Sequence, residues 1–426
     1  MSTKIIEKIS QNVTIKLMVM GFLSLALLIP LFMVRSMIDE RQSYQEGAVS
    51  EISQKWGAAQ TVSSPMLVVK TRKTHTNSKG KTSVEIIRNQ FLAETAQIEG
   101  FVKTETRYRG IYEVIVYSAH LKISGHFKNP RLAGDYSILS GISDFRGLKE
   151  AVDFKWNGHS TRMHGTTDKT DLFKSALWTP VEKCGEKGCV FEFEIQLKGT
   201  GSLQFLPLAK KTAVSLKSNW SNPAFSGYYL PDTREIASSG FNANWAVADF
   251  GDTFSEMAKA DSRAILENSF GVDFIFPVNV YQKSTRAVKY GFLIIVLTFV
   301  MFFLFEVLYS LRIHFLQYLL VGFALSLFFL LLIALSEHVA FTIAYCLAAA
   351  STIFLIAGYC SAILGEKKRS RILAYFLAAL YASLYVLLQN QDYSLLLGSL
   401  LLLLVLATLM YLTRHLDWHT AMQRQK

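Results

Sequence analysis

Residues 292–310 read FLIIVLTFVMFFLFEVLYS, and Glu306 is the one charged residue among them. A helix that crosses the core of a bilayer needs about 20 mainly apolar residues, so this stretch predicts a membrane span. Four similar stretches follow it and one stands near the start of the chain: 316–335, 339–364, 372–388, 394–412 and 17–34. We therefore expect a membrane α-helical protein with six transmembrane helices, one before and five after a long segment of ordinary polarity.

The first apolar stretch, 17–34, could instead be a cleaved signal peptide. Signal peptides end at a cleavage site with small residues on either side of one position, whereas residues 34–38 read VRSMI. We therefore expect an uncleaved transmembrane helix at this position.

The charges beside the spans predict the orientation. Threading six helices places eleven basic residues on one side and none in the short loops 336–338 and 389–393 on the other. The eleven are Lys4, Lys8, Lys16, Arg312, Lys367, Lys368, Arg369, Arg371, Arg414, Arg424 and Lys426. Cytoplasmic loops carry an excess of Lys and Arg, so we expect both termini in the cytoplasm. The expected order is a cytoplasmic tail (1–16), helix 1 (17–34), an exported domain (36–288), a five-helix bundle (292–412) and a second cytoplasmic tail (413–426).

The formal net charge of +11 raises the question of nucleic acid as a partner. Residues 36–288 hold 31 Lys and Arg against 27 Asp and Glu, so most of the excess lies beside the spans. Basic residues in that position are topology signals. We expect the lipid bilayer as a partner and no nucleic acid, and the pattern predicts no particular oligomeric state.

The sequence pattern of the exported segment is typical of a β-rich domain. Residues 191–197 read FEFEIQL, in which Phe191, Phe193, Ile195 and Leu197 alternate with polar residues. Strict alternation predicts a strand with one buried face, and such a face must pack on another layer. We therefore predict a large β-rich, sandwich-like domain.

Two cysteines stand directly before this strand. Cys184 and Cys189 bracket GEKG, a sequence suited to a tight turn. Outside the cytoplasm disulfides form and persist, so we predict a structural disulfide here, with free thiols as the alternative. Redox motifs place two residues between their cysteines, so a catalytic pair is not expected.

Several strings resemble the CreD family of bacterial inner-membrane proteins. They run from Trp56 to Trp418 and include 109–112, 223–227, 240–245, 270–281, 286–291, 314–322, 336–338, 391–398 and 410–418. Two departures are Gln391, where an acidic residue is expected, and the insert that holds Cys184 and Cys189. The resemblance implies an inner-membrane location and hence a periplasmic 36–288 domain. It also implies links to cell-envelope integrity, colicin tolerance and response to β-lactam stress, but no reaction and no catalytic residues.

Ionisable residues in or beside the spans are candidate binding residues, because burying charge in a bilayer is costly. Glu306 lies inside a span, and its structural interpretation is that it snorkels to the nearby cytoplasmic surface or pairs with Arg312. Glu337, His338 and Asp392 lie at the opposite ends of their spans, where capping is the simpler interpretation. Since Glu306 is at the other end, we do not expect the four to form one cluster.

Aromatic residues are dense between 220 and 245, where Trp220, Phe225 and Trp245 could form a binding face or pack in a core. His159 and His164 lack further ligands at metal spacing, and zinc sites need three or four, so we predict no metal and no cofactor. Ala344, Ala348 and Thr352 in one span, and Ala374, Ala378 and Ala382 in the next, are spaced four apart. Small residues at that spacing let helices approach closely, which predicts packing between these two faces.

Known catalytic motifs are lacking: no Walker A, Gly-x-Ser-x-Gly or His-Glu-x-x-His pattern occurs. The leading interpretation is a non-enzymatic inner-membrane protein that binds or scaffolds periplasmic or inner-membrane partners. The alternatives are a transport or translocation subunit, and a membrane enzyme acting on lipid or cell-wall precursors.

Overall fold

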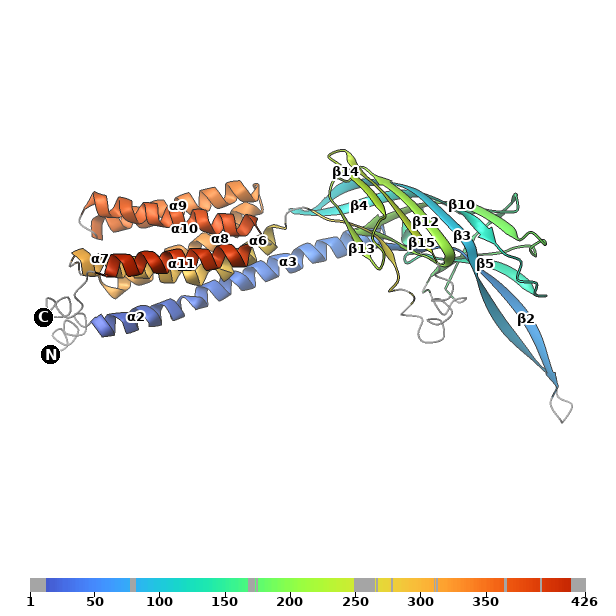
Figure 1. The fold of residues 1–426 in the computed structure, drawn as a ribbon, viewed down its shortest axis with the longest axis horizontal. Helices are drawn as coiled ribbons and strands as arrows, with labels where there is room; N and C mark the ends of the chain where they lie inside the picture. The colour runs from blue at the N-terminus through green and yellow to red at the C-terminus, as the bar shows by residue number, and fades with distance from the viewer. Residues whose placement is uncertain are drawn as a thin grey trace. The chain divides into compact units, whose positions relative to one another are not determined.

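The computed structural model describes residues 13–76, 82–167, 173, 175–248, 265, 267–276, 279–309, 311, 313–363, 366–390 and 393–414. The chain forms two compact units. The helical unit combines Met1–Tyr44 with Val278–Lys426, and the β-unit is Gln45–Pro277. The β-unit is therefore inserted, in sequence, between two parts of the helical unit (Figure 1).

Among the described residues, six helices are long and apolar enough to cross a membrane, one near the N-terminus and five near the C-terminus. This confirms the expected membrane α-helical class with a β-rich domain. The helices are α2 (Val13–Ala26), α3 (Leu28–Trp56), α6 (Val280–Lys289), α7 (Gly291–Tyr309), α8 (Phe315–Ser336), α9 (Phe341–Ile363), α10 (Lys367–Gln389) and α11 (Ser394–Thr413). Helices α2 and α3 together form the first span, and α3 continues beyond the apolar stretch to Trp56.

The packing of α9 against α10 follows the small-residue prediction on one side only. Ala344, Ala348 and Thr352 of α9 are buried, as expected. On α10, however, the buried positions are Leu373, Leu377, Leu380, Tyr381 and Leu384, while the predicted Ala378 and Ala382 are exposed. A row of small residues on one helix already makes room for large side chains on the other, so a second small row is not needed.

The β-unit contains a twelve-stranded sheet and a four-stranded sheet. The large sheet runs β7-β6-β10-β4-β3-β2-β5-β9-β8, with β12, β15 and β14 continuing from β3. Its two end strands, β7 and β8, are separated in sequence only by Met163. The sheet therefore curls until it is nearly a barrel, which satisfies the prediction of a layered β-rich domain.

The bounds of the strands follow the order of the chain. They are β1 (Gln60–Ser63), β2 (Met66–Thr76), β3 (Thr82–Arg109), β4 (Tyr112–Phe127), β5 (Asp135–Gly141), β6 (Asp153–Trp156), β7 (His159–Arg162), β8 (His164–Thr166), β9 (Ala176–Pro180), β10 (Cys189–Thr200), β11 (Ser202–Leu206), β12 (Ala209–Ser218), β13 (Pro223–Gly227), β14 (Thr233–Ala237), β15 (Gly240–Ala248) and β16 (Phe270–Phe274). The small sheet has the order β1-β11-β16-β13.

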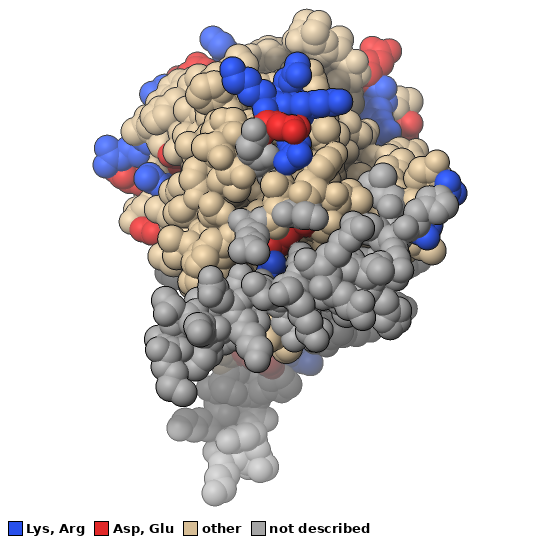
Figure 2. Space-filling view, turned by 90° about the vertical axis from the view of Figure 1, so that its left-hand side faces the viewer, with Lys and Arg blue, Asp and Glu red and all other residues tan. Residues whose placement is uncertain are grey.

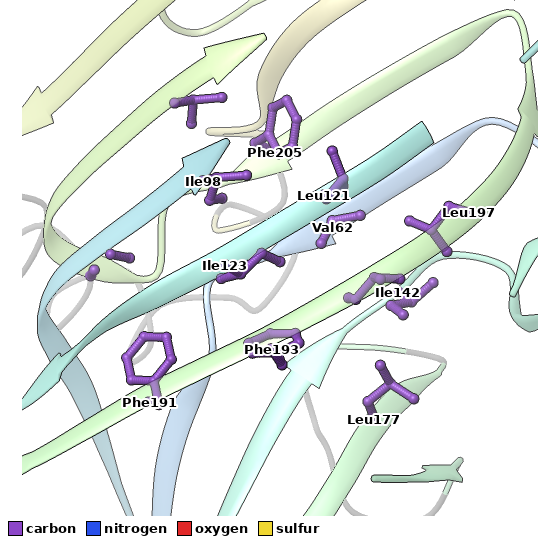
Figure 3. Close-up of a cluster of buried hydrophobic side chains, with 14 of the residues drawn as sticks. Val62, Ile98, Leu121, Ile123, Ile142, Leu177, Phe191, Phe193, Leu197 and Phe205 are labelled. Atoms are coloured by element: carbon purple, nitrogen blue, oxygen red, sulfur yellow. The ribbon is translucent and has the colours of Figure 1, made fainter. Parts of the chain in front are cut away.

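The core of the β-unit is built by the alternation that the sequence shows most clearly in β10. Phe191, Phe193, Ile195 and Leu197 are buried, and their side chains gather with those of β3, β4 and β11 (Figure 3). The ring of Phe154 stacks on that of Phe191 with centroids 6.5 Å apart. Burial of each such side chain contributes about 1.5–3 kcal/mol.

The end of α3 is fixed within the β-unit. The indole of Trp56 donates a hydrogen bond to the Tyr117 carbonyl oxygen (3.2 Å), and the Arg107 guanidinium lies 4.2 Å from the ring centroid. Just beyond, the Asp144 carboxylate accepts hydrogen bonds from the Ala58 amide (2.9 Å) and from Arg146 Nε (3.0 Å). Asp144 therefore holds the segment that leaves the helix.

The pKa of the Asp144 carboxyl is set by two opposing effects. Burial raises this pKa, but the hydrogen bonds from Arg146 and Ala58 outweigh it, so the pKa lies below its usual range. A lowered pKa means that the ionised form stabilises the fold. That stabilisation is present above the unfolded-state pKa, about 3.9, and is lost as the pH falls through the folded-state value.

We predict that Asp144→Asn lowers the free energy of unfolding of the β-unit by about 1–3 kcal/mol at neutral pH. The gap between the two proteins should begin to narrow as the pH falls below about 4 and should close only below the lowered pKa of folded Asp144, where the wild-type carboxyl becomes protonated. Near-UV circular dichroism during urea unfolding of the full chain in detergent measures this. Asp153→Asn is the control, because Asp153 makes only an exposed pair with Arg162. Equal effects from both substitutions would contradict the prediction.

Candidate functional site

Glu306 of α7 lies in a buried polar site, here called the Glu306 site (Lys16, Glu306, Ile313 and Tyr318). The Glu306 side chain is 2% exposed and accepts a hydrogen bond from Lys16 Nζ at 2.6 Å. Its other oxygen accepts from the Tyr318 hydroxyl at 3.3 Å. The Ile313 amide, in the loop after α7, donates at 3.4 Å to the same oxygen as Lys16, Glu306 Oε1.

These partners offset the cost of burying the carboxylate. An ionised group among apolar side chains is strongly unfavourable unless it is paired and hydrogen-bonded. Lys16 comes from α2, Glu306 from α7 and Tyr318 from α8, so one site joins three helices. The Glu306 site is therefore a fixed crosslink within the helical unit.

Lys16 is the functional residue that sequence reasoning missed. The structural interpretation of Glu306 was snorkelling to the membrane surface or a pair with Arg312, and Arg312 lies outside the described residues. The position of each residue within its span could have predicted this pair. Lys16 lies just before its apolar stretch and Glu306 lies near the end of its own. Because the two helices cross the membrane in opposite directions, both residues are at the same membrane surface.

A second site, the Glu337 site (Arg41, Tyr281 and Glu337), lies at the other end of α8. Glu337 is the residue that follows α8 and is 9% exposed. It accepts a hydrogen bond from the Tyr281 hydroxyl at 3.2 Å, and Arg41 Nε lies 3.8 Å away. A helix of 22 residues is about 33 Å long, so the two sites are far apart, as expected.

The short helix α6 is bound to α10 beside this second site. Lys283 Nζ donates to Gln389 Oε1 (2.9 Å), and Arg286 Nη2 donates to the Leu387 carbonyl oxygen (3.3 Å). Gln389 in turn donates to the Tyr385 hydroxyl (2.7 Å). These contacts, together with Tyr281, attach α6 to both α8 and α10.

Of the remaining predicted residues beside the spans, His338 does not join these sites. His338 is exposed next to Glu337, and Asp392 lies outside the described residues. In the described part of the chain, no three His, Cys, Asp or Glu side chains are placed to hold a metal ion.

The aromatic residues between 220 and 245 serve mainly in packing. Trp245 is 2% exposed, with its ring 5.7 Å from that of Phe225. Trp220 is half-buried, and its indole donates to the carbonyl oxygens of Asn222 (3.0 Å) and Ile275 (3.2 Å). Trp245 is therefore a core residue, and the other two support it.

The two cysteines of the β-unit, Cys184 and Cys189, form a disulfide. Their Cα atoms are 5.3 Å apart, across the turn that leads into β10. Both residues are buried, so the disulfide is a structural link at the start of β10.

A shallow pocket of about 310 Å³ opens where β3, β4, β12 and β15 meet. Thr95, Gln97, Lys211 and Thr212 contribute its polar groups, and Ala and Gly residues form much of the rest. No local pattern in the sequence predicts this pocket, because its lining comes from strands that are distant in the chain.

Comparison with known families agrees with this architecture. The model of the family described as "Inner membrane protein CreD" matches residues 12–419, which include both units.

The chain belongs to the CreD family.

A curated CreD relative supports the match along the whole length. The inner membrane protein CreD of Escherichia coli (strain K12) is 31% identical over 410 residues, which cover 93% of this chain and 91% of the relative. Among solved structures, an M1 zinc metallopeptidase from Deinococcus radiodurans aligns with 36% of this chain and 38% of its own, at 10% identity and a TM-score of 0.19. That likeness is too low to carry any argument.

We predict that Lys16→Met and Glu306→Gln each lower the stability of this CreD-family protein by about 3–5 kcal/mol, because each leaves a buried polar group without its partner. The double variant Lys16→Met/Glu306→Gln leaves no unpaired charge, so its loss of stability should be well below the sum of the two single losses. Thermal unfolding in detergent micelles and the protein level in membranes measure the effect.

Glu366→Gln is the matched control, because Glu366 pairs with Arg369 at the surface. Exposed pairs contribute at most about 1 kcal/mol. A double variant as unstable as the sum of the single variants would show that Lys16 and Glu306 do not act as a pair.

Proposed function

We propose that this chain is a non-enzymatic protein of the bacterial inner membrane that supports cell-envelope integrity. In this proposal it holds its β-unit in the periplasm, where the β-unit binds or scaffolds envelope partners. The physiological outcome would be tolerance to colicins and to β-lactam stress.

The observation that carries the proposal is how the helical unit uses its charged groups. Glu306 binds Lys16, and Glu337 binds Tyr281 and lies beside Arg41, so each carboxylate ties helices together. A transport pathway or a catalytic centre needs polar groups that are available to a substrate. Because these carboxylates already bind side chains of neighbouring helices, they favour a helical unit that anchors the β-unit to the membrane.

The exposed surface of the β-unit favours a partner. Residues 228–236 follow the aromatic core and expose Tyr228 (68%), Leu230 (66%) and Ile236 (52%). Exposed apolar patches on soluble domains commonly mark interaction sites. Part of this segment, β14, pairs with β15, the strand that carries the buried Trp245.

The orientation is supported by the charge at one end of the helical unit. Figure 2 looks onto the end at which α2 and α10 begin, and Lys and Arg side chains gather there. Lys367, Lys368 and Arg371 are exposed at the start of α10. At the other end, Lys283 and Arg286 donate hydrogen bonds to α10 and so have a structural role. Positive charge marks the cytoplasmic side.

We predict that a membrane-impermeant maleimide labels His338→Cys in intact spheroplasts but labels Lys368→Cys only after the membrane is opened. Both positions are exposed in the helical unit. The background carries Cys346→Ser and Cys360→Ser, which removes the two free thiols. Labelling of Lys368→Cys in intact spheroplasts would reverse the proposed orientation.

We predict that a photo-crosslinking residue in place of Leu230 captures an envelope protein in living cells, because Leu230 lies in the exposed apolar segment. Val190 is the matched control, since it is a similarly exposed aliphatic residue elsewhere on the β-unit. A partner found from Leu230 and not from Val190 supports the scaffold. If Leu230→Ser and Ile236→Ser leave β-lactam and colicin survival unchanged and no partner is captured, the scaffold proposal fails.

A further inference from the structure

Strands β2 and β3 extend beyond the sheet as a two-stranded ribbon. The pairing of β2 with β5 ends at Lys70, and the pairing of β3 with β12 begins at Ala93. Beyond those points residues 71–76 pair with 82–87 alone in the described chain. Figure 1 shows β2 and its partner strand projecting from the rest of the β-unit. Six residue pairs span about 20 Å.

The two faces of the ribbon differ in charge. In an antiparallel pair, opposite residues lie on one face. Lys70 is opposite Arg88, Arg72 is opposite Ile86 and Thr74 is opposite Val84. We call the face with Lys70, Arg72, Thr74, Val84, Ile86 and Arg88 the basic face. Asp135 of β5 is opposite Lys70 at the base of this face, so its three cations are offset by one carboxylate. On the other face Lys73 is opposite Glu85, so positive and negative charges are balanced there.

The basic face is open to solvent and combines cations with aliphatic side chains. Val84 is 60% exposed and Ile86 is 61% exposed. Arg72 is 74% exposed and lies 3.6 Å from Asp135, an equally exposed residue. The hairpin 66–92 contains six Lys and Arg and one Asp or Glu. The hairpin therefore has a net positive charge, which attracts an anionic partner.

We propose that the basic face binds the surface of an anionic phospholipid membrane. Lys and Arg side chains bind lipid phosphates, while short aliphatic side chains between them enter the boundary of the acyl chains. Protein interfaces have cores rich in aromatic residues, Met and Arg; this face has two Arg but no aromatic residue and no Met. A two-stranded hairpin is marginally stable alone, so contact with a surface also accounts for its length.

This inference deepens the proposed function by naming a lipid surface as one envelope partner. The test in vitro does not depend on which side of the membrane the β-unit occupies. The lipid test does not involve Leu230. A negative lipid result therefore does not contradict the proposed protein partner, and failure to capture a protein from Leu230 does not contradict lipid binding.

The experiment uses the full chain in nanodiscs of phosphatidylcholine, mixed with separate vesicles that contain about one-third phosphatidylglycerol. Binding is measured by co-sedimentation of the discs with the vesicles. We expect binding that disappears at about 1 M salt, where the Debye length is about 3 Å. Pure phosphatidylcholine vesicles should not bind.

Arg72→Gln/Arg88→Gln should weaken binding on the order of thirtyfold, since it removes two cations from the basic face. Lys73→Gln/Lys103→Gln is the control, because it removes two exposed cations that lie off this face. That control should weaken binding less than about threefold. Arg72→Lys/Arg88→Lys keeps the charge and should retain binding, which also shows that the ribbon tolerates substitution.

The aliphatic residues provide a second measurement. Val84→Ser/Ile86→Ser leaves every charge in place and should still reduce binding, since it removes the apolar part of the contact. Equal losses from the basic-face and control variants would show diffuse attraction and overturn the proposal. Unchanged binding by Arg72→Gln/Arg88→Gln, or equal binding to phosphatidylcholine vesicles, would overturn it too.

Discussion

A carboxylate buried among apolar helices must have a partner, and the partner of Glu306 is a lysine 290 residues earlier in the chain. The pair joins α2 to α7, and the Tyr318 hydroxyl adds α8. Because of this requirement the first helix belongs with the last five, although the whole β-unit separates them in sequence. The helical unit is thus one structure made from two distant segments, and the β-unit is an insertion whose two ends both attach to it.

Local patterns predicted the elements well. The bilayer sets the length of a span, so six apolar stretches sufficed to place six helices. In the β-unit, alternation in residues 191–197 predicted the buried face of β10, because a strand has a fixed period of two. The turn sequence between Cys184 and Cys189 was likewise local, and the disulfide lies where it was expected.

Pairings between distant segments could not be predicted in the same way. Only Arg312, near in sequence, could be named as a possible partner of Glu306, whereas the contact with Lys16 depends on how the helices are arranged in space. The alanines of α10 were expected to pack like those of α9, but complementarity requires only one small surface in a pair. The pocket beside Thr212 and the ribbon of β2 and β3 depend on strand order, for which a single sequence carries no local signal.

The distance of 290 residues between Lys16 and Glu306 also sets an order of events during synthesis. At about 5–20 residues per second, the ribosome needs roughly 15 to 60 s to pass from one residue to the other. During that interval α2 has been made and its countercharge has not. The ion pair can close only after the complete β-unit has been synthesised, so closure of the helical unit is a late step in the biogenesis of this protein.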